Sequence, residues 1–215
     1  MKKLFFVLAG VIFCTQIPAQ NTLGFRVAYN HATAANTAEN IRLASLNRFQ
    51  FGVFGKFSMY KNFFLKGSLI YNQKGNFYDD NNMIADAGKR VTVKLDYIEA
   101  SVDIGYAVRL TGKHHIHLAA GPYLAYGING TEKGNGETLM GPIVINRKVA
   151  FTNSKYYDGT KLQIKPIDAG LNFNVGYQFR KYGLFFNYGL GLTNRDIWSK
   201  SFNRVASVGV SYNFK

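Results

Sequence analysis

The sequence predicts an all-β fold, an eight-stranded antiparallel up-and-down β-barrel that spans a membrane. The clearest sign is the segment 167–179, in which every odd position is apolar or aromatic and every even position is polar or glycine. A strand with this period of two has one apolar face and one small polar face. The pattern recurs along the chain with no predicted helix to cover the apolar faces, so we expect those faces to contact lipid.

Composition supports a membrane barrel. Aromatic residues make up 15% of the chain, and there are 22 glycines but only 4 prolines. Membrane barrels place aromatic residues at both membrane interfaces, and glycines fit a crowded lumen. A soluble β-sandwich is the alternative, because alternation alone does not identify the medium that faces the apolar side.

The N-terminal residues 1–19 are predicted to be a secretory signal peptide. Two lysines precede an apolar run that ends at Cys14, and Ala19 offers a small residue for cleavage. The run is shorter than the ~20 residues that a membrane-spanning helix needs. Lipidation at Cys14 is an alternative, but the preceding Phe13 is bulky where a lipoprotein signal has a small residue. Cleavage would leave a mature barrel domain, 20–215, without a cysteine and hence without a disulfide.

The chain is basic, with a formal net charge of +14 that falls to +12 when Lys2 and Lys3 leave with the signal peptide. The basic residues are scattered instead of clustered along a track for a phosphate backbone. We therefore expect no nucleic acid, and we expect outer-membrane lipid and lipopolysaccharide as partners, with an envelope or secretion protein as a further one.

Eight strands are predicted in order from stretches whose alternate residues are apolar. They are residues 22–30, 49–59, 63–74, 90–110, 115–129, 167–179, 183–194 and 203–214. Three short turns (60–62, 111–113, 180–182) alternate with four long loops (31–46, 75–89, 130–164, 195–202). This asymmetry is typical of outer-membrane barrels, which have short periplasmic turns and long external loops. The apolar piece 142–151 is predicted either to extend the sheet or to fold over the mouth.

The fourth strand changes phase. Val91, Val93, Leu95 and Tyr97 share one parity, whereas the apolar residues from Ile98 onward share the other. One extra residue near Tyr97 would reset the register, which predicts a β-bulge there.

The polar faces of the strands carry charges that are expected to meet in the lumen. These are Arg26, Lys56, Lys66, Lys74, Lys94, Asp96, Glu99, Asp103 and Asp168. Such a set could line a conducting pore. We favour a packed, charge-paired interior, because eight strands leave room only for side chains.

Four short segments carry a resemblance to a known family. They are 95–99 (LDYIE), 121–124 (GPYL), 168–173 (DAGLNF) and 208–214 (VGVSYNF). Together they resemble the PorT-type outer-membrane β-barrel family of the Bacteroidetes, small barrels similar to OmpA and OmpX. The resemblance implies the fold and the cell outer membrane, and it raises a role in secretion or envelope biogenesis.

Other candidate sites have simpler interpretations. His114, His115 and His117 could hold a metal but have no acid or cysteine partner at ligand spacing, so a histidine patch at the membrane interface is favoured. The acidic segment 79–82 with Asp86 could bind calcium but lacks the glycine and final glutamate of a calcium loop. His31 and Ser45 qualify as a catalytic pair by position only.

We therefore expect an integral outer-membrane barrel with no catalytic residues, metal or cofactor. Its external loops would have a structural, binding or envelope-biogenesis role. A small channel or a receptor for a small solute is the alternative.

Overall fold

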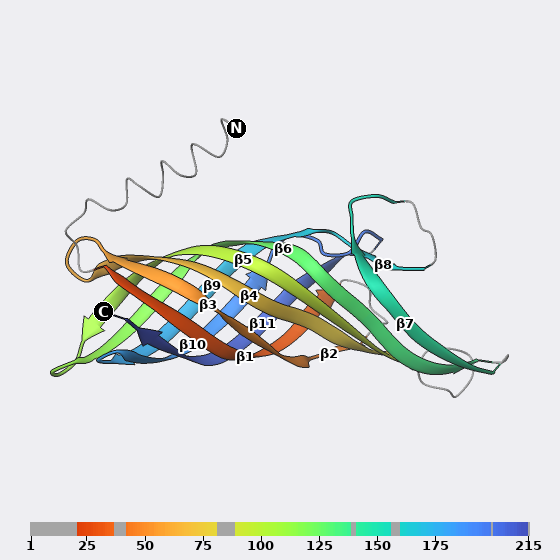
Figure 1. Ribbon diagram of the computed structural model, residues 1–215, viewed down its shortest axis with the longest axis horizontal. Coiled ribbons are helices and arrows are strands. Elements are labelled where there is room, and N and C mark those ends of the chain that lie inside the picture. The colour runs from red at the N-terminus through yellow and green to blue at the C-terminus, as the bar shows by residue number, and fades with distance from the viewer. Residues whose placement is uncertain are drawn as a thin grey trace.

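The computed structural model contains a closed barrel (Figure 1). It describes residues 21–36, 42–80, 89–138, 141–155, 160–198 and 200–214, so the predicted signal peptide lies outside the described residues. Within these ranges the chain forms eleven strands, of which eight close the barrel. The barrel strands are β1 (Thr22–Asn36), β3 (Leu46–Ser58), β4 (Phe63–Asp80), β5 (Lys89–Arg109), β6 (His114–Thr138), β9 (Ile167–Phe179), β10 (Tyr182–Gly191) and β11 (Ser201–Asn213).

Each barrel strand pairs antiparallel with the barrel strand that follows it in the chain, and β11 returns to pair with β1. Closure is continuous, because β1 pairs with β11 from Gly24↔Asn213 to Asn36↔Ser201. The predicted all-β, eight-stranded, up-and-down barrel is confirmed. No helix in the described part of the chain is long and apolar enough to cross a membrane.

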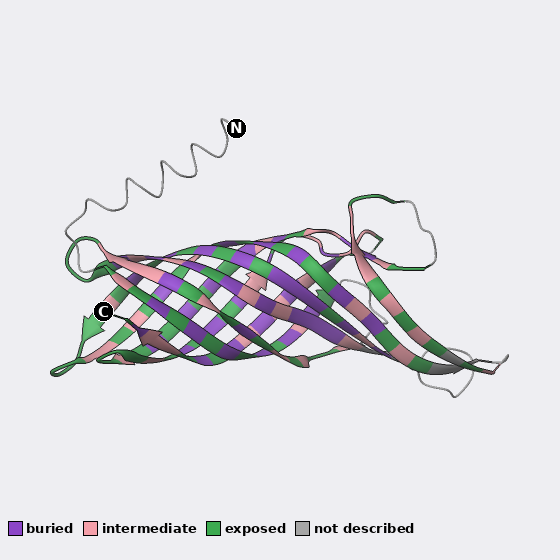
Figure 2. Cartoon of the chain, in the orientation of Figure 1, coloured by how far each residue is buried: buried purple, intermediate pink, exposed green. Residues whose placement is uncertain are grey.

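Side chains alternate between the outer surface and the lumen along each strand (Figure 2). In β9 the residues Leu171, Phe173 and Val175 are exposed, whereas Asn172 and Asn174 between them are buried. The same alternation in the other strands leaves an apolar outer belt that no described part of the chain covers. Such a belt is what a transmembrane barrel presents to lipid.

The three short turns and both described chain ends lie at one end of the barrel, here called the turn end. The amide of Phe214 donates a hydrogen bond to the carbonyl of Leu23 at 2.8 Å, which joins the two ends of the chain. Each short turn contains one residue with positive φ: Lys61 (54°), Gly112 (61°) and Arg180 (52°). The left-handed backbone lets the strands reverse direction within two or three residues.

At the opposite end, here called the loop end, three neighbouring strands are unusually long. The strands β4, β5 and β6 have 18, 21 and 25 residues, whereas about 9–11 tilted residues cross a bilayer. Their outer parts extend the wall of the barrel, and β7 (Gly141–Phe151) continues that sheet beyond β6 (Figure 1). The short β2 (Arg42–Ala44) pairs with β4, and β8 (Leu162–Ile164) pairs parallel with the end of β7.

Much of the sequence predicted as loops 75–89 and 130–164 is therefore strand. Outside the membrane a strand has no lipid to face, so its sequence need not alternate. The segment 142–151 extends the sheet as β7, which was one of the two predicted outcomes.

The predicted bulge exists, but the extra residue is in a different strand. The register between β5 and β6 shifts between Asp96↔Asn129 and Tyr97↔Gly127, which leaves Ile128 of β6 unpaired. The strand β5 itself keeps one register with β4 from Phe63↔Tyr106 to Asp80↔Lys89. Its odd residues thus all face inward, and the apolar residues from Val91 to Tyr97 lie inside the barrel instead of outside it.

Candidate functional site

The middle of the lumen is occupied by a buried ion network centred on Lys74. Its Nζ lies 2.7 Å from Glu99 Oε2 and 2.8 Å from Asp168 Oδ2, and all three side chains are at most 2% exposed. Lys74 comes from β4, Glu99 from β5 and Asp168 from β9, so the network joins two sides of the barrel. We call these three residues the Lys74 network.

Amide and hydroxyl side chains satisfy the remaining lone pairs of the network. Asn72 donates to Glu99 Oε2 at 2.8 Å, and Asn172 donates to Glu99 Oε1 at 3.3 Å. Tyr123 donates to Asp168 at 3.3 Å. Buried carboxylates need several such partners, because each unsatisfied polar atom in a dry interior is costly. These partners were absent from the predicted set, although their inward parity could have identified them.

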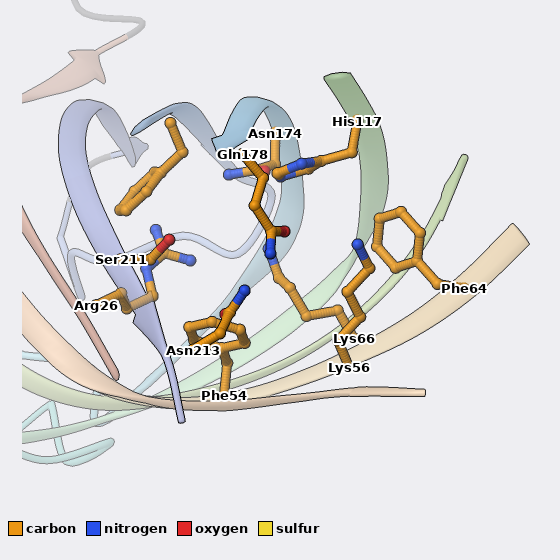
Figure 3. Close-up of a pocket in the computed structure, with 11 residues that line it drawn as sticks. Arg26, Phe54, Lys56, Phe64, Lys66, His117, Asn174, Gln178, Ser211 and Asn213 are labelled. Carbon is orange, nitrogen blue, oxygen red and sulfur yellow. The ribbon is translucent and has the colours of Figure 1, made fainter. Parts of the chain in front are cut away.

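The charged side chains in the turn-end half of the lumen are mainly positive. Arg26, Lys56 and Lys66 line a cavity of about 30 Å³ together with aromatic and polar side chains (Figure 3). Lys66 Nζ lies 3.2 Å from Asp103 Oδ2. Arg26 Cζ lies 4.1 Å above the ring of Phe185, and Lys56 Nζ lies 4.2 Å above the ring of Phe64.

Seven of the nine predicted lumen charges thus face the interior, and two do not. Lys94 is exposed on the outer side of β5, because this strand does not reset its register. Asp96 shares that side but is only 8% exposed. It accepts hydrogen bonds from Arg48 at 2.8 Å and from Asn129 at 3.0 Å.

An apolar cluster lies inside the loop end. It consists of Val91, Val93, Leu95, Tyr97, Tyr123, Ala125 and Ile164, with Ile145, Val149, Phe151 and Leu162 packed against it. The ring of Phe151 lies 5.7 Å from that of Tyr97 and fills the space that a side chain at Gly127 would need. We call this cluster the apolar plug. Through it, inward side chains of β7 and β8 pack against β5 and β6.

The loop-end parts of β5 and β6 form, with β7, a sheet that we call the projecting sheet. On its outer side Lys94, Thr131 and Lys148 form one cross-strand row, and Lys133 pairs with Asn146 in the next. Along residues 142–146 the only strand described beside β7 is β6. Val144 is 77% exposed there.

The remaining candidates are dispersed. His114 Nδ1 contacts the hydroxyl of Tyr177 and its ring stacks on Phe179 at 4.6 Å, while His117 faces the lumen near Phe64. Within the described ranges, no three His, Cys, Asp or Glu side chains form a group that could hold a metal ion. His31 is exposed, with Nδ1 3.4 Å from Asn47 Oδ1. Residues 81–88 of the acidic loop lie outside the described residues.

A family model matches most of the sequence, and some solved structures are similar to the fold at low identity. A family model for the outer membrane protein β-barrel domain matches residues 18–196. Among solved structures, the attachment invasion locus protein Ail of Yersinia pestis is similar, with a TM-score of 0.40 and 13% identity over 90% of this chain and 99% of that one. Neisserial surface protein A is similar with a TM-score of 0.45 and 13% identity, over 89% of this chain and 97% of that one.

No curated protein matches the chain. The family match covers most of the 215 residues, and the closed barrel with its apolar belt is the fold that the family model describes. The chain therefore belongs to the outer membrane protein β-barrel domain family and resides in the outer membrane.

Proposed function

We propose that this protein is a non-conducting, non-catalytic barrel that binds an envelope or secretion protein outside the membrane through its projecting sheet. The observation that carries the proposal is the contrast between the two ends of β6. The turn-end part of β6 belongs to the wall around a filled lumen. Its loop-end part and β7 form a sheet that continues past the barrel.

The filled lumen argues against a small channel, which is the alternative. The Lys74 network crosses the interior with two N–O distances below 3 Å. The apolar plug lies above it, and a dewetted apolar constriction is itself a barrier to ions. In an eight-stranded barrel, side chains such as these close the passage from one end of the lumen to the other.

The projecting sheet has the features of a docking surface for an extended peptide. The run Ile143-Val144-Ile145 has high β-propensity and lies in the outermost antiparallel strand. Edge strands with unpaired backbone groups add a strand from a partner readily. The resemblance to PorT-type barrels supports a partner from secretion or envelope biogenesis. Lipopolysaccharide would surround the base of the sheet, where Lys94 could meet its phosphates.

Orientation is tested by labelling cysteines in intact cells with a membrane-impermeant maleimide. Asn135→Cys lies on the projecting sheet and Asn62→Cys in a short turn, and both native side chains are exposed. The mature chain as predicted has no other cysteine. We expect labelling of Asn135→Cys alone, and labelling of Asn62→Cys alone would place the sheet in the periplasm.

Binding is tested with a photo-crosslinking amino acid at position 144 in living cells, compared with the same residue at Phe173 on the lipid-facing side of β9. A discrete protein adduct at position 144 only is expected. Purified protein should also give no conductance steps in a planar bilayer. Steps of uniform size would support the channel instead.

A further inference from the structure

We infer that the turn-end half of the lumen is a binding site for a small oxyanion of the phosphate type, entered from the turn end. The site comprises Arg26, Lys56 and Lys66 around the cavity in Figure 3. It lies at the opposite end of the barrel from the projecting sheet and does not depend on the proposed function.

The two halves of the lumen differ in the balance of charge among their described residues. In the middle and the loop-end half, the cations Lys74, Arg147 and the buried Arg195 are matched in number by the carboxylates Glu99, Glu132 and Asp168. In the turn-end half, the buried Arg26 and Lys66 and the half-buried Lys56 face Asp103, and the other carboxylate near Arg26, Glu99, is already paired with Lys74. That half therefore has an excess of two positive charges. Uncompensated buried charge is strongly unfavourable, and a bound anion would remove most of that penalty.

Arg26 is almost fully buried in the lumen, with an exposed fraction of only 5%. Its Nε and Nη2 atoms are buried without a hydrogen-bond partner. The N–H bonds on these two nitrogens run parallel along one edge of the guanidinium group. That edge is the one that binds two oxygens of a phosphate, sulfate or carboxylate at once. Arg26 Cζ also lies 4.1 Å above the ring of Phe185, while Nε and Nη2 on this edge have no hydrogen-bond partner.

The cavity is accessible from the turn end. The cavity shares Lys56, Phe64 and Gln178 with a wider opening of about 420 Å³ at the turn end. Lys61, Arg109 and His115 also line that opening, and no acidic residue lines either space. A cleft lined by one sign of charge concentrates ions of the opposite sign. Anions would therefore be drawn inward as far as Arg26, where the Lys74 network and its amides close the lumen beyond.

The chemistry of the lining favours an oxyanion over a halide. The guanidinium edge supplies two directed donors, and the ammonium groups of Lys56 and Lys66 can approach other oxygens of a tetrahedral anion. Phe54, Phe64 and Phe185 give part of the lining an apolar surface, and a low local dielectric strengthens each charge-assisted hydrogen bond. A phosphate monoester group has the required charge and oxygen count, whether it belongs to free phosphate or to a lipid headgroup.

The experiment measures binding of radiolabelled inorganic phosphate to the folded barrel in a neutral detergent by equilibrium dialysis, and binding of dihexanoyl phosphatidic acid in parallel. Arg26→Gln removes the charge and the donor edge, and should weaken binding about 10- to 100-fold. Lys113→Gln removes one positive charge from an exposed turn at the same end, outside the cavity, and should leave binding unchanged.

Each outcome is decisive. Saturable phosphate binding that Arg26→Gln weakens supports the site with a soluble anion, and the same dependence for phosphatidic acid alone supports it with a lipid headgroup. Absence of saturable binding of both probes, or equal binding by Arg26→Gln, overturns it. The heat-dependent gel shift of the barrel verifies folding of each variant, and Lys56→Gln at the cavity entrance replaces Arg26→Gln if that variant does not fold.

Discussion

A charged lysine in the middle of a narrow barrel destabilises the fold unless its charge is fully compensated. Lys74 is 2% exposed and has carboxylates from two other strands within 2.8 Å. The carboxylates in turn accept hydrogen bonds from Asn72, Asn172 and Tyr123. A buried set of this kind is sensitive to the loss of one member, because the rest are left as unpaired buried charges.

Replacing Lys74 with methionine should therefore destabilise the barrel severely. The side chain keeps its length but leaves Glu99 and Asp168 without their cation, and we expect a loss of about 3–5 kcal/mol in the free energy of unfolding. Urea unfolding in lipid vesicles measures this loss. Lys94→Met is the matched control, since Lys94 is exposed and should change stability by less than ~0.5 kcal/mol. Equal midpoints for the two variants would contradict a central role of the network.

Inward residues could be identified from parity wherever a strand alternates regularly. Arg26, Lys66 and Asp103 were placed in the lumen on that basis, and they lie there. Lys94 was not placed correctly, because its neighbours in β5 are apolar on the inward side and mimic a change of register. Parity could not identify Arg195 as an inward residue, because it lies between β10 and β11 and not in an alternating strand. Its Nη1 donates a hydrogen bond to Asn76 Oδ1 at 2.7 Å.

At the scale of elements, the bulge at Ile128 separates two different environments of β6. Ile128 and Asn129 are both exposed, and the inward residues on either side are Gly127 and Gly130. The bulge thus leaves both flanking parts of the strand with the correct face inward, whereas a missing residue elsewhere would reverse one of them. Sequence alone could locate the irregularity to within a few residues, but it could not assign it to β6, because the partner strand only becomes known with the pairing.

Deletion of Ile128 should therefore be tolerated. One outward residue would remain between Gly127 and Gly130, so every side chain would keep its face and the pairing Asp96↔Asn129 would persist. Deletion of Ala100 from β5 should prevent folding, because that strand is regular along its whole pairing with β4. The heat-dependent gel shift after refolding distinguishes the two deletion variants. Failure of both would mean that the bulge has a role beyond register.

At the scale of the whole molecule, two kinds of exposed apolar surface must be separated. The belt around the barrel contacts lipid, and the projecting sheet extends beyond it. Burial in the isolated chain does not distinguish them, since Val102 on the belt is 49% exposed and Val144 on the sheet is 77% exposed. The sequence predicted the belt because lipid imposes alternation on it, and it predicted nearly the whole of β5 as residues 90–110. It missed the outer parts of β4 and β6, residues 75–80 and 130–138, because their sequences do not alternate.

Substitution of each of these two valines by arginine distinguishes a lipid environment from water. Val102 lies near the middle of the outward residues of β5, so Val102→Arg would place a charge near the centre of the bilayer and should cost about 2–4 kcal/mol. Val144→Arg would place the same charge in water and should change stability by less than ~0.5 kcal/mol. Both free energies come from denaturant unfolding in lipid vesicles. A large cost at Val144 would mean that the sheet lies against the membrane instead of above it, and the binding surface would then have to be sought on its other side.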